Sequence, residues 1–116
     1  MRQIIFYRTQ TGHCTVEEFL DTLSSKQAKK VSWVLKLIEE LDRVPSQYFE
    51  KLVNTDGIWE VRVQFGGNIF RLLGFLGDSM TLILNHAFTK KTQKTPAQDI
   101  ALAENRKREH IRRAKQ

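Results

Sequence analysis

Apolar residues in the first half of the chain change from a strand-like to a helix-like spacing. Residues 2–8 are rich in β-branched and aromatic side chains and predict a first strand. Thr15-Val-Glu-Glu18 has the spacing of a capping box and precedes apolar residues at helical intervals, which predicts a short helix. A longer amphipathic helix is predicted from Ser25 and should end before Pro45. The short connection between these helices favours an antiparallel helical hairpin.

After Asp56-Gly57 the period of the apolar positions changes from helical to alternating. Three strands are predicted at residues 58–65, 69–76 and 79–88, joined by two-residue turns at Gly66-Gly67 and Gly77-Asp78. Thr95-Pro96-Ala97-Gln98 predicts a last helix with Thr95 as its N-cap, and its thin apolar stripe suggests a fraying end. The pattern therefore predicts an α+β domain of order β-α-α-β-β-β-α, with a mainly antiparallel sheet packed on the helical hairpin.

The Gly66-Gly67 turn determines which residues of its two strands face each other. A two-residue loop pairs Phe65 with Asn68 and therefore places Arg62 opposite Arg71. One face of this hairpin is then apolar, and the other carries both arginines. Two arginines directly across a ladder repel each other unless an anion or a carboxylate lies between them. The arginine face is therefore a candidate phosphate site.

The second hairpin and the segment after it add further candidates to the arginine face. A Gly77-Asp78 loop would place His86 opposite Ile69, diagonal to Arg71 and on the face of both arginines. Lysines 90, 91 and 94 follow where the last strand leaves the sheet. Structural interpretations stay open as well. Glu60 could neutralise Arg62, Arg71 and His86 could be satisfied within the sheet, and the lysines could form an ordinary solvated loop.

The charge distribution separates the C-terminal segment from the rest of the 116 residues. Residues 1–89 carry ten basic and ten acidic side chains, so the net charge of +6 belongs to residues 90–116. A localised basic segment points to a polyanionic partner. The length fits a single domain covering residues 1–116, of which residues 95–116 form the basic C-terminal helix or tail.

Several classes of protein are disfavoured by what the sequence lacks. A single cysteine, Cys14, cannot form an internal disulfide, and no apolar stretch approaches the length of a membrane span, so a cytoplasmic protein is expected. There is no phosphate-binding glycine loop, no Gly-x-Ser-x-Gly elbow and no His-Glu-x-x-His motif. The carboxylates fall on polar helix faces away from the basic sheet, so any cleavage is expected to proceed without a metal ion or another cofactor.

Three runs of residues resemble the HigB-like, phage-derived branch of the RelE/ParE toxins over nearly the whole chain. They are Leu52-Val-Asn-Thr-Asp-Gly-Ile-Trp-Glu-Val-Arg62-Val, Phe70-Arg71-Leu-Leu and Asn85-His-Ala-Phe-Thr-Lys-Lys-Thr-Gln-Lys-Thr-Pro96. The resemblance implies a RelE-like microbial ribonuclease fold and the toxin half of a type II toxin–antitoxin pair. Many such toxins cleave mRNA in the ribosomal A site. The implied partners are a helix-turn-helix antitoxin, mRNA and ribosomal RNA, with no membrane.

The chemistry that this resemblance implies is attack of a ribose 2′-hydroxyl on the adjacent phosphate, without a metal. Arg62 and Arg71 would clamp the phosphate, because a guanidinium can bind two of its oxygens at once. His86 would titrate near neutrality, and Lys90 or Lys91 would add positive charge. Phe88 would stack on a base, and Lys94 would contact RNA. The basic residues from Arg106 to Lys115, including Arg108 and Arg112, would steer the protein towards ribosomal RNA.

Two other functions remain open at this stage. A gyrase poison of the ParE type shares the fold and needs no catalytic residues. A non-catalytic nucleic-acid-binding module would rely on the basic tail, although the sequence shows no interleaved exposed aromatics for a stacking platform. The chain also departs from many of the proteins it resembles. They carry a tyrosine near the end of the sheet or in the C-terminal segment, whereas the last tyrosine here is Tyr48.

Overall fold

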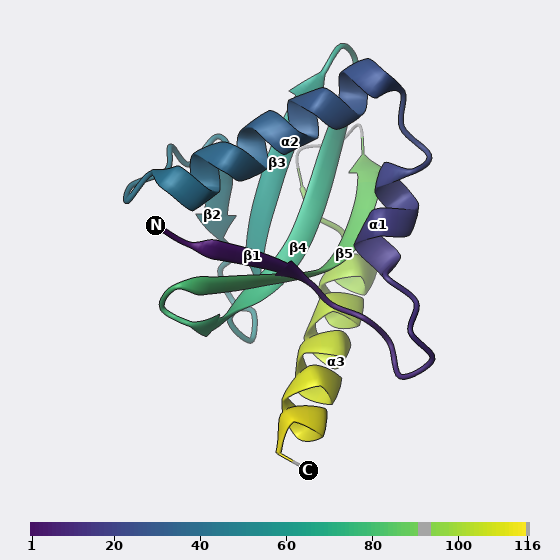
Figure 1. Ribbon diagram of the computed structural model, residues 1–116, viewed down its shortest axis with the longest axis vertical. Coiled ribbons are helices and arrows are strands. Elements are labelled where there is room, and N and C mark those ends of the chain that lie inside the picture. Colours follow the sequence, from purple (N-terminus) through teal and green to yellow (C-terminus); the bar gives the residue numbers. More distant parts are fainter. Residues whose placement is uncertain (91–93, 116) are drawn as a thin grey trace.

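A computed structural model describes residues 1–90 and 94–115 of the chain. Its centre is a five-stranded sheet in the order β1-β5-β4-β3-β2, in which β1 runs parallel to β5 and all other neighbours are antiparallel (Figure 1). The strands are β1 (Gln3–Phe6), β2 (Phe49–Lys51), β3 (Trp59–Phe65), β4 (Asn68–Asp78) and β5 (Thr81–Lys90). The predicted α+β class is confirmed. The sheet is mixed, and β2, which was not predicted, extends it at one edge.

Helices cover both faces of this sheet. Helices α1 (Thr15–Leu20) and α2 (Ser25–Glu40) bury Val16, Val31, Val34 and Ile38 against one face, which includes Leu72, and α2 crosses the strands in Figure 1. The third helix, α3 (Ala97–Ala114), buries Ala103 against Leu73. Because neighbouring residues of a strand point to opposite faces, the contacts of Leu72 and Leu73 place α3 on the face away from α1 and α2.

Two predicted helix caps are wrong because their hydroxyl groups bond elsewhere. Thr15 lies inside α1, which begins after Cys14, and its hydroxyl donates to the carbonyl oxygen of Asn85 at 2.9 Å. Thr95 precedes the N-cap of α3, which is Pro96. Helix α2 does have a capping box, formed by Ser24 and Gln27. The hydroxyl groups of these two threonines therefore make tertiary hydrogen bonds instead of capping a helix, although their spacing in the sequence matches a cap.

The first hairpin has the predicted register and the second does not. Across Gly66-Gly67, Phe65 pairs with Asn68 and Arg62 with Arg71. The second turn lies at Ser79-Met80, because Asp78 pairs with Thr81 and its carboxylate accepts from the backbone N–H of Met80 at 2.8 Å. Two irregularities shift the pairs, at residues 73/74 and 76/78.

The shifted register moves His86 along the sheet without changing its face. His86 lies opposite Leu73 instead of Ile69, whose partner is Lys90. It remains diagonal to Arg71, which pairs with Phe88. Gly74 is required at the first irregularity, since an added Cβ would lie 2.1 Å from the carbonyl oxygen of Ile83. This close approach of the two backbones was not visible in the sequence.

The C-terminal half of α3 is held against the sheet, so the predicted fraying is wrong. The Tyr7 hydroxyl donates to Glu109 at 2.6 Å, and Arg113 pairs with Glu109 and donates to the carbonyl oxygen of Arg8. The side-chain amide of Asn85 donates to the carbonyl oxygen of Ala103 at 3.0 Å. These contacts anchor a helix whose apolar stripe is narrow.

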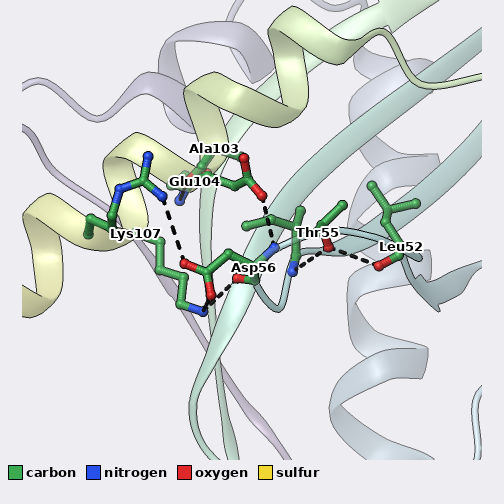
Figure 2. Close-up of polar contacts among 9 residues, drawn as sticks. Leu52, Thr55, Asp56, Ala103, Glu104 and Lys107 are labelled. Atoms are coloured by element: carbon green, nitrogen blue, oxygen red, sulfur yellow. Dashed lines mark hydrogen bonds and ion pairs between the residues drawn. The ribbon is translucent and has the colours of Figure 1, made fainter.

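A loop between β2 and β3 also docks on α3 (Figure 2). The backbone N–H of Asp56 donates to the Glu104 carboxylate at 2.8 Å, and Lys107 Nζ donates to the Asp56 carbonyl oxygen at 2.6 Å. The Thr55 hydroxyl donates to the carbonyl oxygen of Leu52 at 2.8 Å and closes the loop.

None of the helices in the described residues combines the length and apolar composition that a membrane crossing requires.

Candidate functional site

A buried carboxylate lies between the two arginines that face each other on β3 and β4. Arg62 Nε donates to Glu60 Oε1 at 2.5 Å, and an Arg71 terminal nitrogen donates to Glu60 Oε2 at 3.1 Å. The Thr95 hydroxyl donates to the same Glu60 oxygen and accepts from Arg71 at 2.9 Å. We call Glu60, Arg62, Arg71 and Thr95 the arginine cluster. Its carboxylate removes the repulsion expected for two arginines across a ladder.

The two arginines differ sharply in their exposure. The Arg71 side chain is 1% exposed and that of Glu60 is 0% exposed, so this ion pair is fully desolvated. The Arg62 side chain is 32% exposed and makes a second ion pair, with the exposed Glu50 at 3.1 Å. Arg62 is therefore the accessible arginine of the cluster, whereas Arg71 belongs to its buried part. The phosphate-clamping roles of both arginines stay predictions.

A pocket of about 530 Å³ opens beside the arginine cluster. Its cationic lining residues are Lys30, Arg62 and Arg71, and its other lining residues are Gln47, Tyr48, Gln64 and Ile69. The pocket lies where β2 leaves the edge of β3, at the point where the Arg62 backbone N–H donates to the Tyr48 carbonyl oxygen at 2.9 Å. Among the described residues, no carboxylate lines it. An anion in the pocket would meet Lys30 and the exposed part of Arg62, whose charge is partly offset by Glu50 and Glu60 behind the lining.

Helix α2 and the β2 connection contribute residues to this pocket that the sequence analysis missed. Lys30 comes from a helix surface that the periodicity marks only as polar. Tyr48 and Gln47 belong to a segment for which no element was predicted. Only the pairing of β2 with β3 brings this segment beside Arg62. No spacing in the sequence signals that contact.

His86 is bound between the sheet and α3. Its Nε2 lies 2.8 Å from Asp99 Oδ1, its Nδ1 lies 3.4 Å from an Arg106 terminal nitrogen, and its ring stacks on Phe88 with centroids 5.2 Å apart. Burial lowers the pKa of His86, an effect that outweighs the opposing influence of Asp99. The neutral ring that results can donate from Nε2 to Asp99 and accept at Nδ1 from Arg106.

We expect the neutral state of His86 to make stability depend on pH. Its pKa is lower in the folded chain than in the unfolded one, where it is about 6.5. The contribution of the neutral ring is therefore complete above about pH 6.5 and is lost as the pH falls towards the folded pKa. Urea denaturation between about pH 7.5 and pH 5.5 should show a falling free energy of unfolding.

The His86→Gln variant should show a flatter dependence on pH over the same range, because it removes the group that takes up a proton on unfolding. His13→Gln is the matched control, since the His13 side chain is exposed and its ring contacts only Glu18 among the described side-chain contacts. Its profile should follow that of the unmodified protein. Parallel profiles for all three proteins would show that burial of His86 does not govern this pH dependence.

The other predicted residues that the structure describes are not among those lining the pocket. Phe88 is packed beneath α3 and against His86. Lys90 is half-buried at the end of β5, Lys94 is exposed next to Thr95, and Lys91 lies outside the described residues. On α3, Arg108 bonds to Asn105 and reaches Asp56, and Arg112 is exposed in the last turn. Their contacts with RNA stay predictions.

No group of three or more histidine, cysteine, aspartate or glutamate side chains suited to a metal ion occurs among residues 1–90 and 94–115. The polar groups that line the pocket are its cations, its two side-chain amides and the Tyr48 hydroxyl. This combination can bind the oxygens of a phosphate and form hydrogen bonds with a hydroxyl group of a ligand. It is the arrangement expected of a site for an anionic, hydroxyl-bearing ligand.

Residues 18–108 match the family model described as phage derived protein Gp49-like (DUF891). The match extends from α1 into α3 and includes all the residues of the arginine cluster and the pocket. The chain therefore belongs to the Gp49-like family, a family of phage-derived RelE/toxin-like proteins in toxin–antitoxin systems. A comparison with curated proteins finds no match for the chain.

Proposed function

We propose that this chain is the toxin half of a type II toxin–antitoxin pair and cleaves mRNA on the ribosome. In this proposal it has the RelE-like fold and belongs to the HigB-like branch of the RelE/ParE toxins. Its partner is a helix-turn-helix antitoxin encoded with it. The observation that carries the proposal is the pocket in which Arg62, Lys30 and Tyr48 meet, with no carboxylate in its described lining.

The reaction would be an attack by a ribose 2′-hydroxyl on the adjacent phosphorus. The new 2′-oxygen–phosphorus bond forms as the bond to the 5′-oxygen breaks, which leaves a 2′,3′-cyclic phosphate and a 5′-hydroxyl end. A base takes the 2′-proton, and the leaving 5′-oxygen receives a proton. The phosphate gains negative charge in the transition state, so a fixed cation next to it accelerates the reaction.

The exposure of each pocket residue suggests its role in this reaction. Arg62 is accessible and would bind the phosphate oxygens, while Glu60 and Arg71 would hold the Arg62 guanidinium in place from the buried side. Lys30 would add positive charge. The Tyr48 hydroxyl can donate and accept hydrogen bonds at the reacting groups. His86 would support α3, because both of its ring nitrogens have partners there.

The experiment that tests this proposal is induction of the chain in a bacterial host without its antitoxin. Growth should stop, and transcripts should be cut within their coding sequences. Intact transcripts accompanied by breaks in DNA would reject the proposal and would indicate a gyrase poison. Growth without arrest, at normal levels of folded protein, would also reject it.

A further inference from the structure

Trp33 is an exposed aromatic residue at the border of the cationic pocket. It lies on α2, and 48% of its surface is exposed. The Tyr48 ring packs edge-on against it, with centroids 5.8 Å apart and planes at 83°. Lys30 Nζ lies 4.9 Å from the centroid of the indole ring. Because Tyr48 and Lys30 both line the pocket, their contacts place Trp33 directly beside it.

The core of the protein does not account for the position of Trp33. The other tryptophan, Trp59, stacks on Phe49 at 4.7 Å and packs against the main core. Tyr48 packs against the same core, whereas Trp33 is outside the described core clusters. A large aromatic surface that stays in contact with water beside a cationic pocket is typical of a binding surface.

We propose that Trp33, Tyr48, Lys30 and Arg62 form a subsite for one nucleotide unit of single-stranded RNA. Lys30 and Arg62 bind its phosphate, and its base stacks on the aromatic pair. The pocket volume of about 530 Å³ falls in the range of small-ligand sites. This inference rests on the proposed function and deepens it, because it adds recognition of a base to a site that binds a phosphate.

The chemistry of the surface favours RNA over a protein partner. Adjacent aromatic rings and cations match the two parts of a nucleotide, the flat base and the charged phosphate. The side-chain amides of Gln47 and Gln64, which line the same pocket, can bond to the edges of a base. The sequence analysis found no stacking platform because Trp33 and Tyr48 come from separate elements.

The test uses Trp33 as its own reporter. The chain contains two tryptophans, so Trp59→Phe leaves Trp33 as the single indole. Titration of this protein with hexa-adenylate RNA should quench the fluorescence, because a base stacks on the ring. An abasic ribose-phosphate hexamer of the same charge should bind about tenfold more weakly and leave the fluorescence unchanged.

Two substitutions of Trp33 complete the test in the otherwise unmodified chain, with labelled RNA as the readout. Trp33→Leu should weaken the binding of hexa-adenylate about tenfold and leave the binding of the abasic hexamer unchanged. Trp33→Phe keeps a stacking ring and should retain most of the affinity. Circular dichroism checks that both variants fold, as expected for a half-exposed residue.

Several outcomes would overturn the subsite, and one would reject the proposed function instead. Equal affinity for the two hexamers would show that only phosphates are recognised, and failure to bind either would remove the subsite altogether. If Trp33→Leu binds hexa-adenylate normally but no longer binds the antitoxin, the surface is a protein interface. Binding is measured without ribosomes or cleavage. If RNA binds through Trp33 but is never cut, the proposed function is rejected and the subsite stands. If Trp33→Leu cleaves mRNA normally, and the unmodified protein binds both hexamers with equal affinity, the subsite is rejected and the proposed function stands.

Discussion

Replacing Glu60 with leucine is expected to lower the free energy of unfolding by about 3–5 kcal/mol. Glu60 is fully buried, and its two carboxylate oxygens accept bonds from Arg62, Arg71 and Thr95. Without the carboxylate, the Arg71 guanidinium stays in the interior and loses its ion pair with Glu60, and removing one partner of a buried pair is strongly destabilising. Urea denaturation of the purified variant measures this loss.

Two further variants separate the buried charge from the other effects of the Glu60 substitution. Glu50→Gln removes the exposed partner of Arg62 and should cost less than about 1 kcal/mol, because solvent screens that pair. Glu60→Leu combined with Arg71→Met should recover much of the lost stability, since an apolar pair can replace a buried ion pair. A Glu60→Leu protein as stable as the unmodified one would show that Glu60 does not neutralise Arg71.

Replacing Arg62 with alanine is expected to slow mRNA cleavage by about 10²–10³-fold, the usual effect of removing one group that stabilises the transition-state charge. Arg62 is the accessible guanidinium of the cluster, and Glu60 continues to pair with Arg71 in its absence. The fold should therefore survive the substitution. Cleavage of an mRNA in a purified translation reaction measures the rate at saturating concentrations of programmed ribosomes.

Two further variants, Arg62→Lys and Arg108→Ala, test whether the effect depends on the guanidinium of Arg62. Lysine keeps the charge but cannot bind two phosphate oxygens in one plane, so an intermediate rate is expected. Arg108 lies on α3 outside the pocket lining, and its side chain is 55% exposed. Arg108→Ala should leave the saturated rate unchanged and weaken binding mainly at low salt, because salt screens the attraction between an exposed cation and RNA. An Arg62→Ala protein that cleaves at the normal rate would remove Arg62 from the reaction.

The strand pattern and the turn residues predicted the part of the fold that carries the two arginines. The alternation along residues 59–73 has one apolar face, and only a two-residue loop at Gly66-Gly67 keeps this face continuous. The second hairpin offered a similar dipeptide, Gly77-Asp78, but the turn lies two residues later. The Asp78 carboxylate accepts from the backbone N–H of Met80 inside this later turn, a contact that the dipeptide pattern does not reveal.

The sequence predicted the two arginines of the candidate site but not the residues that surround them. Pairing placed Arg62 opposite Arg71, but the burial of Arg71 depends on Thr95, whose spacing resembles an ordinary N-cap. Tyr48 and Lys30 reach the pocket through the short strand β2 and the packing of α2. Those contacts join segments that are far apart in the chain, so the local periodicity of the sequence does not predict them.

The most direct test of the central claim is to map the 5′ ends of transcripts after induction without the antitoxin. We predict new ends within coding sequences, each carrying a 5′-hydroxyl group, as attack by the 2′-hydroxyl requires. These ends should be absent from cultures that express Arg62→Ala at the same level. Growth arrest with uncut transcripts, or the same ends in the Arg62→Ala cultures, would contradict the assignment of this pocket to mRNA cleavage.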